Sequence, residues 1–345
     1  MKLTILFGGA SFEHEISIVS AITLKEKLSQ FSLTFVFCDT DHTFYHIDAA
    51  KMKAKTFSSG EYKKLPQLIL SKEGFVQKGM FSKTAHKNVV LNLIHGADGE
   101  DGTIASLLDF YGIEYIGPRS DACTFSYDKR YTKYLCDAIG VKSVKYEVVR
   151  KNEPTNIQIP YPIIIKPSRL GSSIGVSIVK DESGLDYALD VAFEFDESVI
   201  VEPFLEGVKE YNLAGYFAEG KMHFSIVEEP HKEEFLDFEK KYMDFSRGEQ
   251  VLGAEIDEEL TARLQSNFER VYRGLFEGAL IRCDFFVHHD EVLLNEINPI
   301  PGSMANYLFD DFATAIELLS QALPKRQMIK SNYEYIHSIS KAKGK

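Results

Sequence analysis

The amino-acid sequence predicts an α/β protein with several domains. Short and almost continuously apolar segments alternate with segments of helical periodicity, as expected for strands buried between helices. Glycine-rich turns follow several of the apolar segments. The chain has 345 residues, which is enough for two or three domains.

Composition and charge exclude several classes of function. The chain has 39 Lys and Arg against 51 Asp and Glu, a net charge of −12, so nonspecific binding to nucleic acid or to anionic membranes is not expected. No segment approaches the ~20 apolar residues of a membrane span. The apolar stretch at 3–7 is too short for the core of a signal peptide. The four cysteines form no C-x-x-C pair, which is typical of reduced thiols, and we expect a cytoplasmic protein.

The first segment predicts a strand, a glycine turn and a helix. Residues 3–7 form the strand, Gly8-Gly9-Ala10-Ser11 the turn and residues 15–28 the helix. The exposed N–H groups of such a unit attract anions, although the motif is neither a dinucleotide fingerprint nor a P-loop. Glu13 lies in the loop, where its carboxylate can recognise an ammonium group. A helix-capping or solvated role is the alternative.

A second glycine-rich segment follows the apolar strand predicted at 89–94. It runs His95-Gly96-Ala97-Asp98-Gly99-Glu100-Asp101-Gly102, and ligands of α/β sheets bind at such carboxyl ends of strands. The other elements predicted up to Pro118 are a strand at 33–38, an insertion at 41–88 with a hairpin at 66–77, a helix at 103–111 and a strand at 114–116. The order indicates a small Rossmann-like sheet.

The central part of the chain predicts a lysine-bearing strand and a flexible loop. The strand at 161–167 carries Lys166, and the Gly/Ser loop at 168–176 follows it. A loop rich in N–H and O–H donors suits a lid over phosphate groups, and a hairpin tip without a ligand is the alternative. The neighbouring predicted elements are a helix at 128–138 carrying Lys129, a strand at 146–149, a helix at 184–195 and a strand at 199–202 that runs into Pro203-Phe204-Leu205.

The last part of the chain centres on a hairpin that spans 282–298. Alternate residues of a strand share a face, so Arg282 and Asp284 point the same way, as do Glu296 and Asn298. All-oxygen ligands without Cys or His suit Mg²⁺ held together with substrate phosphates. A solvated polar face is the alternative, but the apolar strands argue against it. The remaining predicted elements are strands at 210–217 and 222–227, a helix at 258–276, a helix at 313–322 and a frayed basic tail at 325–345; residues 231–250 fit either a helix or a loop.

The register of this hairpin depends on its loop. A three-residue loop at 289–291 pairs His288 with Val292 and places Asp284 opposite Glu296. Like charges that face each other destabilise a sheet, so we expect a cationic group between them.

These segments together resemble the ATP-grasp superfamily and, within it, the D-alanine–D-alanine ligase family, over residues 3–322. In chain order the matching motifs are Gly8-Gly9-Ala10-Ser11-x-Glu13-x-Glu15-x-Ser17, His95-Gly96-x-x-Gly99-Glu100-Asp101-Gly102, Lys166-Pro167-Ser168-Arg169-x-Gly171-Ser172-Ser173-x-Gly175, Lys241-Tyr242-x-Asp244, Arg282-x-Asp284 and Glu296-x-Asn298-x-x-Pro301-Gly302. The resemblance implies a Rossmann-like N-terminal domain at 1–118, a central lid domain at 119–208, a C-terminal catalytic domain with an antiparallel sheet at 209–324 and a basic tail at 325–345. It also implies a homodimer.

The resemblance further implies a ligand for each part of the site. ATP would have its phosphates on Lys129, Lys166, Ser172 and Ser173, its adenine at Glu202, Pro203, Phe204 and Leu205 beside Phe286, and its ribose on Glu210. Two Mg²⁺ or Mn²⁺ ions would bind Asp284, Glu296 and Asn298. The first D-alanine would bind Glu13 and His95, and the second Lys241, Tyr307 and Leu308. Arg282 and the Gly302 N–H would stabilise the tetrahedral intermediate, while Glu13, Ser172 and Tyr242 would be linked by hydrogen bonds.

One departure from the family concerns the second substrate. The family usually has Ser-Leu where this chain has Tyr307-Leu308, which leaves selectivity for the acceptor open. Tyr242 is the residue type of dipeptide-forming members, and relatives that use D-lactate lack it, so an amine acceptor is preferred. The alternatives are another ATP-grasp ligase, including one that uses D-serine or D-lactate, and a noncatalytic nucleotide-binding protein. A dehydrogenase-like Rossmann protein would need a better fingerprint than Gly8-Gly9.

Overall fold

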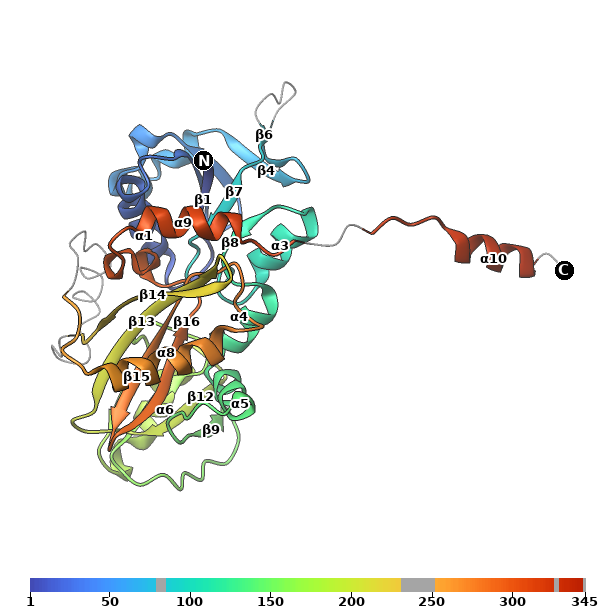
Figure 1. Cartoon of the computed structure of the whole chain (residues 1–345). Helices are drawn as coiled ribbons and strands as arrows, with labels where there is room; N and C mark the ends of the chain where they lie inside the picture. The colour runs from blue at the N-terminus through green and yellow to red at the C-terminus, as the bar shows by residue number, and fades with distance from the viewer. Residues whose placement is uncertain (79–84, 231–251, 326–328, 344–345) are drawn as a thin grey trace.

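The computed structural model describes residues 1–78, 85–230, 252–325 and 329–343. Within these residues the strands form three sheets, of eight, four and four strands (Figure 1). The α/β class predicted from the sequence is confirmed. No helix in this described part is both long enough and apolar enough to cross a membrane.

The N-terminal sheet is larger than the predicted Rossmann-like sheet. Four strands are parallel, in the order β2-β1-β7-β8, and the insertion at 41–88 extends this sheet with antiparallel strands. The strands are β1 Lys2–Gly8, β2 Ser32–Cys38, β3 Phe44–Ile47, β4 Gln67–Ser71, β5 Gly74–Gln77, β6 Ala85–His86, β7 Val89–Asn92 and β8 Tyr115–Ile116. The helices are α1 His14–Lys27, η1 Ala49–Lys51, α2 Ala54–Ser58, η2 Glu61–Lys64 and α3 Thr103–Tyr111.

The central sheet is antiparallel, in the order β11-β10-β12-β9. Its strands are β9 Glu147–Arg150, β10 Ile163–Pro167, β11 Ser177–Val179 and β12 Ser198–Pro203, with η3 Glu182–Gly184 and α6 Leu185–Phe193 beside them. Helix α5 (Lys129–Ile139) begins at Asp128, whose side chain accepts a hydrogen bond from the Arg130 N–H. Helix α4 (Ser120–Tyr127) was not predicted, because its Ser, Asp, Thr and Cys residues have low helix propensity.

The C-terminal sheet carries the hairpin, in the order β14-β13-β15-β16. Its strands are β13 Lys209–Ala218, β14 Lys221–Glu228, β15 Ile281–His288 and β16 Glu291–Asn298. The helices are α8 Glu258–Tyr272, η4 Gly302–Leu308, α9 Phe312–Gln321 and α10 Glu334–Lys343. In Figure 1, α10 lies away from the body of the molecule at the end of the extended tail.

A shared hydrophobic core joins the two ends of the chain. Leu3 and Phe7 of β1 belong to the same cluster of buried side chains as Leu308 and Ile316. The contact is completed by a buried hydrogen bond from the Ser303 N–H to the hydroxyl of a serine in α1. The segment that follows the hairpin is therefore held against the N-terminal sheet.

Candidate active site

The hairpin turn contains two residues rather than three. His288 pairs with Glu291, so the predicted pairing with Val292 is wrong. His289 and Asp290 both have left-handed backbone angles, with φ of 48° and 63°. Turns with two left-handed residues match the twist of the flanking strands. The usual sequence signal, Asn-Gly, is absent, which is why the turn was missed.

The predicted pairing of Asp284 with Glu296 is nevertheless confirmed, because an irregularity in the ladder compensates for the shorter turn. Phe285 pairs with Leu294, whereas Asp284 pairs with Glu296, so Asn295 is an extra residue in β16. A bulge of this kind changes the direction in which side chains point. The two carboxylates therefore do face each other across the hairpin.

Cationic side chains lie beside both carboxylates. The Arg282 guanidinium donates from Nε to Asp284 Oδ1 at 2.7 Å and from Nη2 to Oδ2 at 2.9 Å. Burial opposes the charge on Arg282, but the Asp284 carboxylate holds the pKa of that guanidinium well above its usual value. Asn298 Nδ2 also donates to Asp284, at 2.9 Å. The Lys129 ammonium lies 3.6 Å from Glu296 Oε1, so the expected cationic neighbours come from the protein itself.

A buried carboxylate links the N-terminal domain to the Gly/Ser loop. Glu13 is only 6% exposed, and its Oε1 accepts a hydrogen bond of 2.6 Å from the Ser172 hydroxyl. It makes no capping bond to α1, so the alternative capping role is not realised. Burial raises the pKa of Glu13, the Ser172 hydrogen bond opposes that effect, and the charge of Glu296 adds to it.

Two glycines make room for this carboxylate. A Cβ atom on Gly171 would lie 2.9 Å from Glu13 Oε1, and one on Gly96 would lie 2.8 Å from Oε2. In the loop itself, Ser172 and Ser173 have left-handed φ angles of 55° and 58°. The tight contact therefore depends on the absence of side chains at both glycines.

Two titratable residues near Glu13, Lys129 and Glu100, complete the electrostatics of this region. Lys129 donates from Nζ to the Leu170 carbonyl at 2.6 Å and is thereby held under the loop. Burial, followed by the charge of Glu13, raises the pKa of Glu100 well above its usual value. The sequence placed Glu100 within a motif but gave it no role. Glu13, Glu100 and Glu296 thus lie close enough to affect one another's charge, and a cationic ligand here would lower the raised pKa values of Glu13 and Glu100.

His95 is buried at the end of β7. Its Nδ1 lies 2.6 Å from the Leu93 carbonyl and must donate to it, since a carbonyl only accepts. Burial lowers the pKa of His95 to about 4, although backbone hydrogen bonds with Leu93 and Pro301 oppose that effect. The ring is therefore neutral near pH 7, and it would have to take up a proton to donate a second hydrogen bond to a carboxylate.

The central sheet holds its predicted nucleotide residues in a buried charge cluster. Lys166 Nζ lies 2.6 Å from Glu202 Oε2, and a second lysine, Lys133, lies 2.6 Å from Oε1. Lys166 also lies 3.4 Å from the side-chain oxygen of Asn295 in β16, across the gap between two sheets. Lys133 was not predicted from the sequence, because a lysine in a helix is usually on its solvated face.

The other predicted nucleotide residues lie around the end of β12. Pro203 ends this strand, and the Phe204 N–H donates to the Pro162 carbonyl at 2.9 Å, while Leu205 follows directly. Glu210 of β13 pairs with Phe286 of β15. Glu210 and Phe286 therefore lie on adjacent strands of the C-terminal sheet, whereas Pro203 lies in the central sheet.

The segment after the hairpin carries the departure from the family. Tyr307 accepts a hydrogen bond of 3.3 Å from Arg282 Nη1, and Leu308 is fully buried. Burial raises the pKa of the Tyr307 hydroxyl to about 12. Just after Gly302, the segment 303–305 has three successive left-handed residues, each of which costs about 1–3 kcal/mol. Lys241 and Tyr242 lie outside the described residues.

The hairpin face suits divalent metal ions. It presents two carboxylates and a carboxamide, a set that fits Mg²⁺ when substrate phosphates complete the shell. No group of three or more His, Cys, Asp or Glu in the described ranges is arranged to hold a metal ion, so the protein alone offers only part of such a shell. The arrangement fits ions that arrive with a nucleotide.

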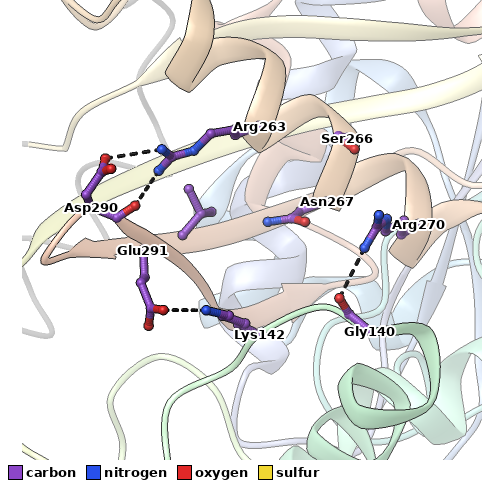
Figure 2. A pocket seen from close by; sticks show the side chains of 9 residues that line it. Gly140, Lys142, Arg263, Ser266, Asn267, Arg270, Asp290 and Glu291 are labelled. Atoms are coloured by element: carbon purple, nitrogen blue, oxygen red, sulfur yellow. Dashed lines mark hydrogen bonds and ion pairs between the residues drawn. The ribbon is translucent and has the colours of Figure 1, made fainter.

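A surface hollow of about 440 Å³ lies at the outer end of the hairpin (Figure 2). Its cations are already bonded: Arg263 to Asp290, Lys142 to Glu291 and Arg270 to the backbone. None of the predicted site residues lines it. We therefore place the candidate active site around Glu13, Lys166 and Asp284 and not in this hollow.

Two antiparallel sheets lie beside an α/β domain. Lys129 and Lys166 contact the hairpin of the C-terminal sheet through Glu296 and Asn295. This fold and this site together define a ligase of the ATP-grasp class. Family models described as the N-terminus and the C-terminus of D-ala D-ala ligase match residues 2–118 and 135–322. The chain is 71% identical to the D-alanine–D-alanine ligase of Sulfurimonas denitrificans and 51% identical to that of Campylobacter jejuni, with full coverage of both chains. The chain belongs to the D-alanine–D-alanine ligase family.

Solved structures show the same fold. The crystal structure of the D-alanine–D-alanine ligase from Helicobacter pylori matches with a TM-score of 0.85 and 46% identity, covering 95% of this chain and 100% of that one. The VanG D-Ala:D-Ser ligase of Enterococcus faecalis matches with a TM-score of 0.73 and 24% identity, over 93% and 97% of the two chains. The second match shows the fold alone, and a ligase with another acceptor therefore shares the architecture.

Proposed function

We propose that this protein is an ATP-dependent ligase that joins two D-alanine molecules into D-alanyl-D-alanine, a precursor for bacterial peptidoglycan. Membership of the family supports the activity. The observation that carries the proposal is the buried Glu13 carboxylate, bonded to Ser172 of the loop at 2.6 Å. It offers a buried carboxylate to an ammonium group, and Lys129 is held under the same loop.

The first D-alanine binds with its ammonium on Glu13 and its carboxylate near His95. An ammonium neighbour would offset the burial that raises the pKa of Glu13. Because His95 is neutral before substrate arrives, an approaching carboxylate would favour its protonated form. Both charges of the amino acid would thus find complementary groups.

ATP binds between the central and C-terminal sheets. Lys129, Lys166 and the loop serines Ser172 and Ser173 hold its phosphates. The segment 202–205 and Phe286 hold the adenine, and Glu210 holds the ribose. Two Mg²⁺ or Mn²⁺ ions would be held by Asp284, Glu296 and Asn298, where they would neutralise charge on the transferring phosphoryl group.

The reaction passes through an acylphosphate. The carboxylate of the first D-alanine attacks the γ-phosphorus, the bond to ADP breaks, and the carboxyl carbon gains a phosphate leaving group. The amine of the second D-alanine, having lost a proton, attacks that carbon. Arg282 and the Gly302 N–H donate to the oxyanion of the tetrahedral intermediate, and its collapse expels phosphate and leaves the peptide bond. The loop closed on Glu13 excludes water that would hydrolyse the acylphosphate.

The second D-alanine binds near Tyr307 and Leu308, with Lys241 and Tyr242 as further candidates. The Tyr307 hydroxyl accepts a hydrogen bond from the Arg282 guanidinium, and its own proton is available to the carboxylate of the acceptor. We also propose that the protein is a cytoplasmic homodimer. Its three domains are proposed to end at residues 118, 208 and 324, as expected from the sequence.

Phosphate release from ATP with D-alanine as the only amino acid tests this proposal. The wild-type chain should release phosphate only when D-alanine is present. Arg282→Ala and Glu296→Gln should each abolish turnover while the circular dichroism spectrum is unchanged, because one removes an oxyanion donor and the other a metal ligand. Normal turnover in either folded variant contradicts the role assigned to that residue.

A further inference from the structure

Lys133 is a buried lysine that the reaction described above does not use. It lies in α5 and is only 1% exposed. Lysine is almost never fully buried unless it is paired. Its ammonium lies 2.6 Å from Glu202 Oε1, and the ring of Tyr146 lies 5.9 Å away. Among the described residues, the ion-pair partner of this ammonium is the Glu202 carboxylate.

Glu202 has two lysine partners, one on each oxygen. Lys133 contacts Oε1 and Lys166 contacts Oε2, both at 2.6 Å. Burial alone would raise the pKa of Glu202, but the two ammonium groups lower it to about 2. One cation would be enough to neutralise this carboxylate. The cluster therefore holds two ammonium groups against one carboxylate, and the carboxylates of Glu296 and Glu210 also act on Lys166.

The three residues come from elements that face the nucleotide region from different sides. Lys166 and Glu202 lie on the adjacent strands β10 and β12, whereas Lys133 lies in α5, which packs against β16 and α8 of the C-terminal domain. Figure 1 shows α5 beside β12. Lys166 also reaches Asn295 of β16. The cluster thus spans the two domains between which ATP is proposed to bind.

We propose that Lys133 is a positioning residue that holds Glu202, so that Lys166 is free to transfer its charge to the ATP phosphates. With Lys133 in place, Lys166 can leave Glu202 without stranding a bare buried carboxylate. Without Lys133, Glu202 would depend on Lys166 alone and would retain it. This inference rests on the proposed ATP site, and it concerns a residue that touches no part of the substrate.

The test compares binding of a nonhydrolysable ATP analogue with Mg²⁺, by calorimetry, to the full chain and to Lys133→Met. Methionine keeps the length of the side chain and removes its charge. Loss of a charge-assisted contact to the phosphates should weaken analogue binding about tenfold or more. The KM for ATP should rise by a similar factor, while the KM for D-alanine stays within about twofold. Lys142→Met is the matched control, because the Lys142 side chain is exposed and pairs with Glu291 on the surface.

A double variant separates positioning from a structural effect. Lys133→Met combined with Glu202→Gln removes both charges, so Lys166 is no longer retained. Glu202→Gln alone measures the cost of losing the adenine contact, and the double variant should bind the analogue within about threefold of that single variant. Unchanged binding in folded Lys133→Met overturns the inference. A double variant that folds but binds at least about tenfold more weakly than Glu202→Gln also overturns it, and this comparison decides the question if Lys133→Met does not fold. Absence of analogue binding to the wild-type chain instead contradicts the proposed function.

Discussion

Substitution of Gly171 by alanine tests the contact between Glu13 and the loop. The new Cβ would lie 2.9 Å from Glu13 Oε1 and 3.4 Å from Oε2, and the first distance is closer than real Cβ atoms approach. Gly171 does not have a left-handed backbone, so alanine fits its φ angle and the fold should survive. The carboxylate must instead rotate away from the methyl group.

The size of the effect follows from the hydrogen bond that this rotation breaks. Oε1 is the atom that accepts the 2.6 Å bond from Ser172. A hydrogen bond to a charged group contributes about 1.5–3 kcal/mol, which corresponds to roughly a 10- to 150-fold change in an equilibrium constant. We expect Gly171→Ala to raise the KM for the first D-alanine by a factor in this range and to leave the KM for ATP nearly unchanged.

The assay is the initial rate of phosphate release over a range of D-alanine concentrations, with thermal unfolding measured in parallel. Gly184→Ala is the matched control, because its Cβ would meet only an ordinary contact of 3.4 Å with Val179. Wild-type dependence on D-alanine in Gly171→Ala, at unchanged thermal stability, would refute the role of the buried carboxylate.

Two further predictions concern the acceptor side and the hairpin. Tyr307→Phe removes the hydroxyl that accepts a hydrogen bond from Arg282. Because that bond is 3.3 Å long, the KM for the second D-alanine should rise only about threefold to tenfold. Burial raises the pKa of Tyr307 to about 12, so the phenol is neutral between pH 6 and 9 and the pH profile of the variant should keep the wild-type shape in that range. A changed profile would show that the phenol titrates. His289→Asn with Asp290→Gly should stabilise the two-residue turn by about 1 kcal/mol, reduced by the loss of the exposed ion pair with Arg263. The urea midpoint should rise with kcat unchanged, and a lower midpoint would contradict the turn geometry.

The pairing of Asp284 with Glu296 was predicted correctly, but from a loop length that is wrong, because two departures from a regular hairpin cancel each other. The turn is one residue shorter than expected, and the extra Asn295 in β16 restores the pairing of Asp284 with Glu296. The turn depends on left-handed backbone angles that favour glycine or asparagine but are adopted here by His289 and Asp290. A single sequence carries no clear signal for such a turn or for an extra residue in the ladder.

The interactions between distant segments were the least predictable part of the site. The bond between Glu13 and Ser172 joins residues 159 positions apart and was expected only from the family resemblance. Lys133 had no such support, because a lysine on a helix is normally solvated. Helix α5 is amphipathic, yet its inner face includes this charge, since Glu202 lies opposite it. Only the fold brings the two together.

Identification of the product tests the central claim most directly. The full chain is incubated with ATP and Mg²⁺ in four separate reactions, and the products are identified by mass spectrometry. The four reactions contain D-alanine alone, D-alanine with D-serine, D-alanine with D-lactate, and L-alanine alone. The account predicts D-alanyl-D-alanine in an amount equal to the phosphate released, and no product from L-alanine. Phosphate release that yields only a product of D-alanine with D-serine or D-lactate would contradict D-alanine as the acceptor. The change of acceptor would then be assigned to Tyr307.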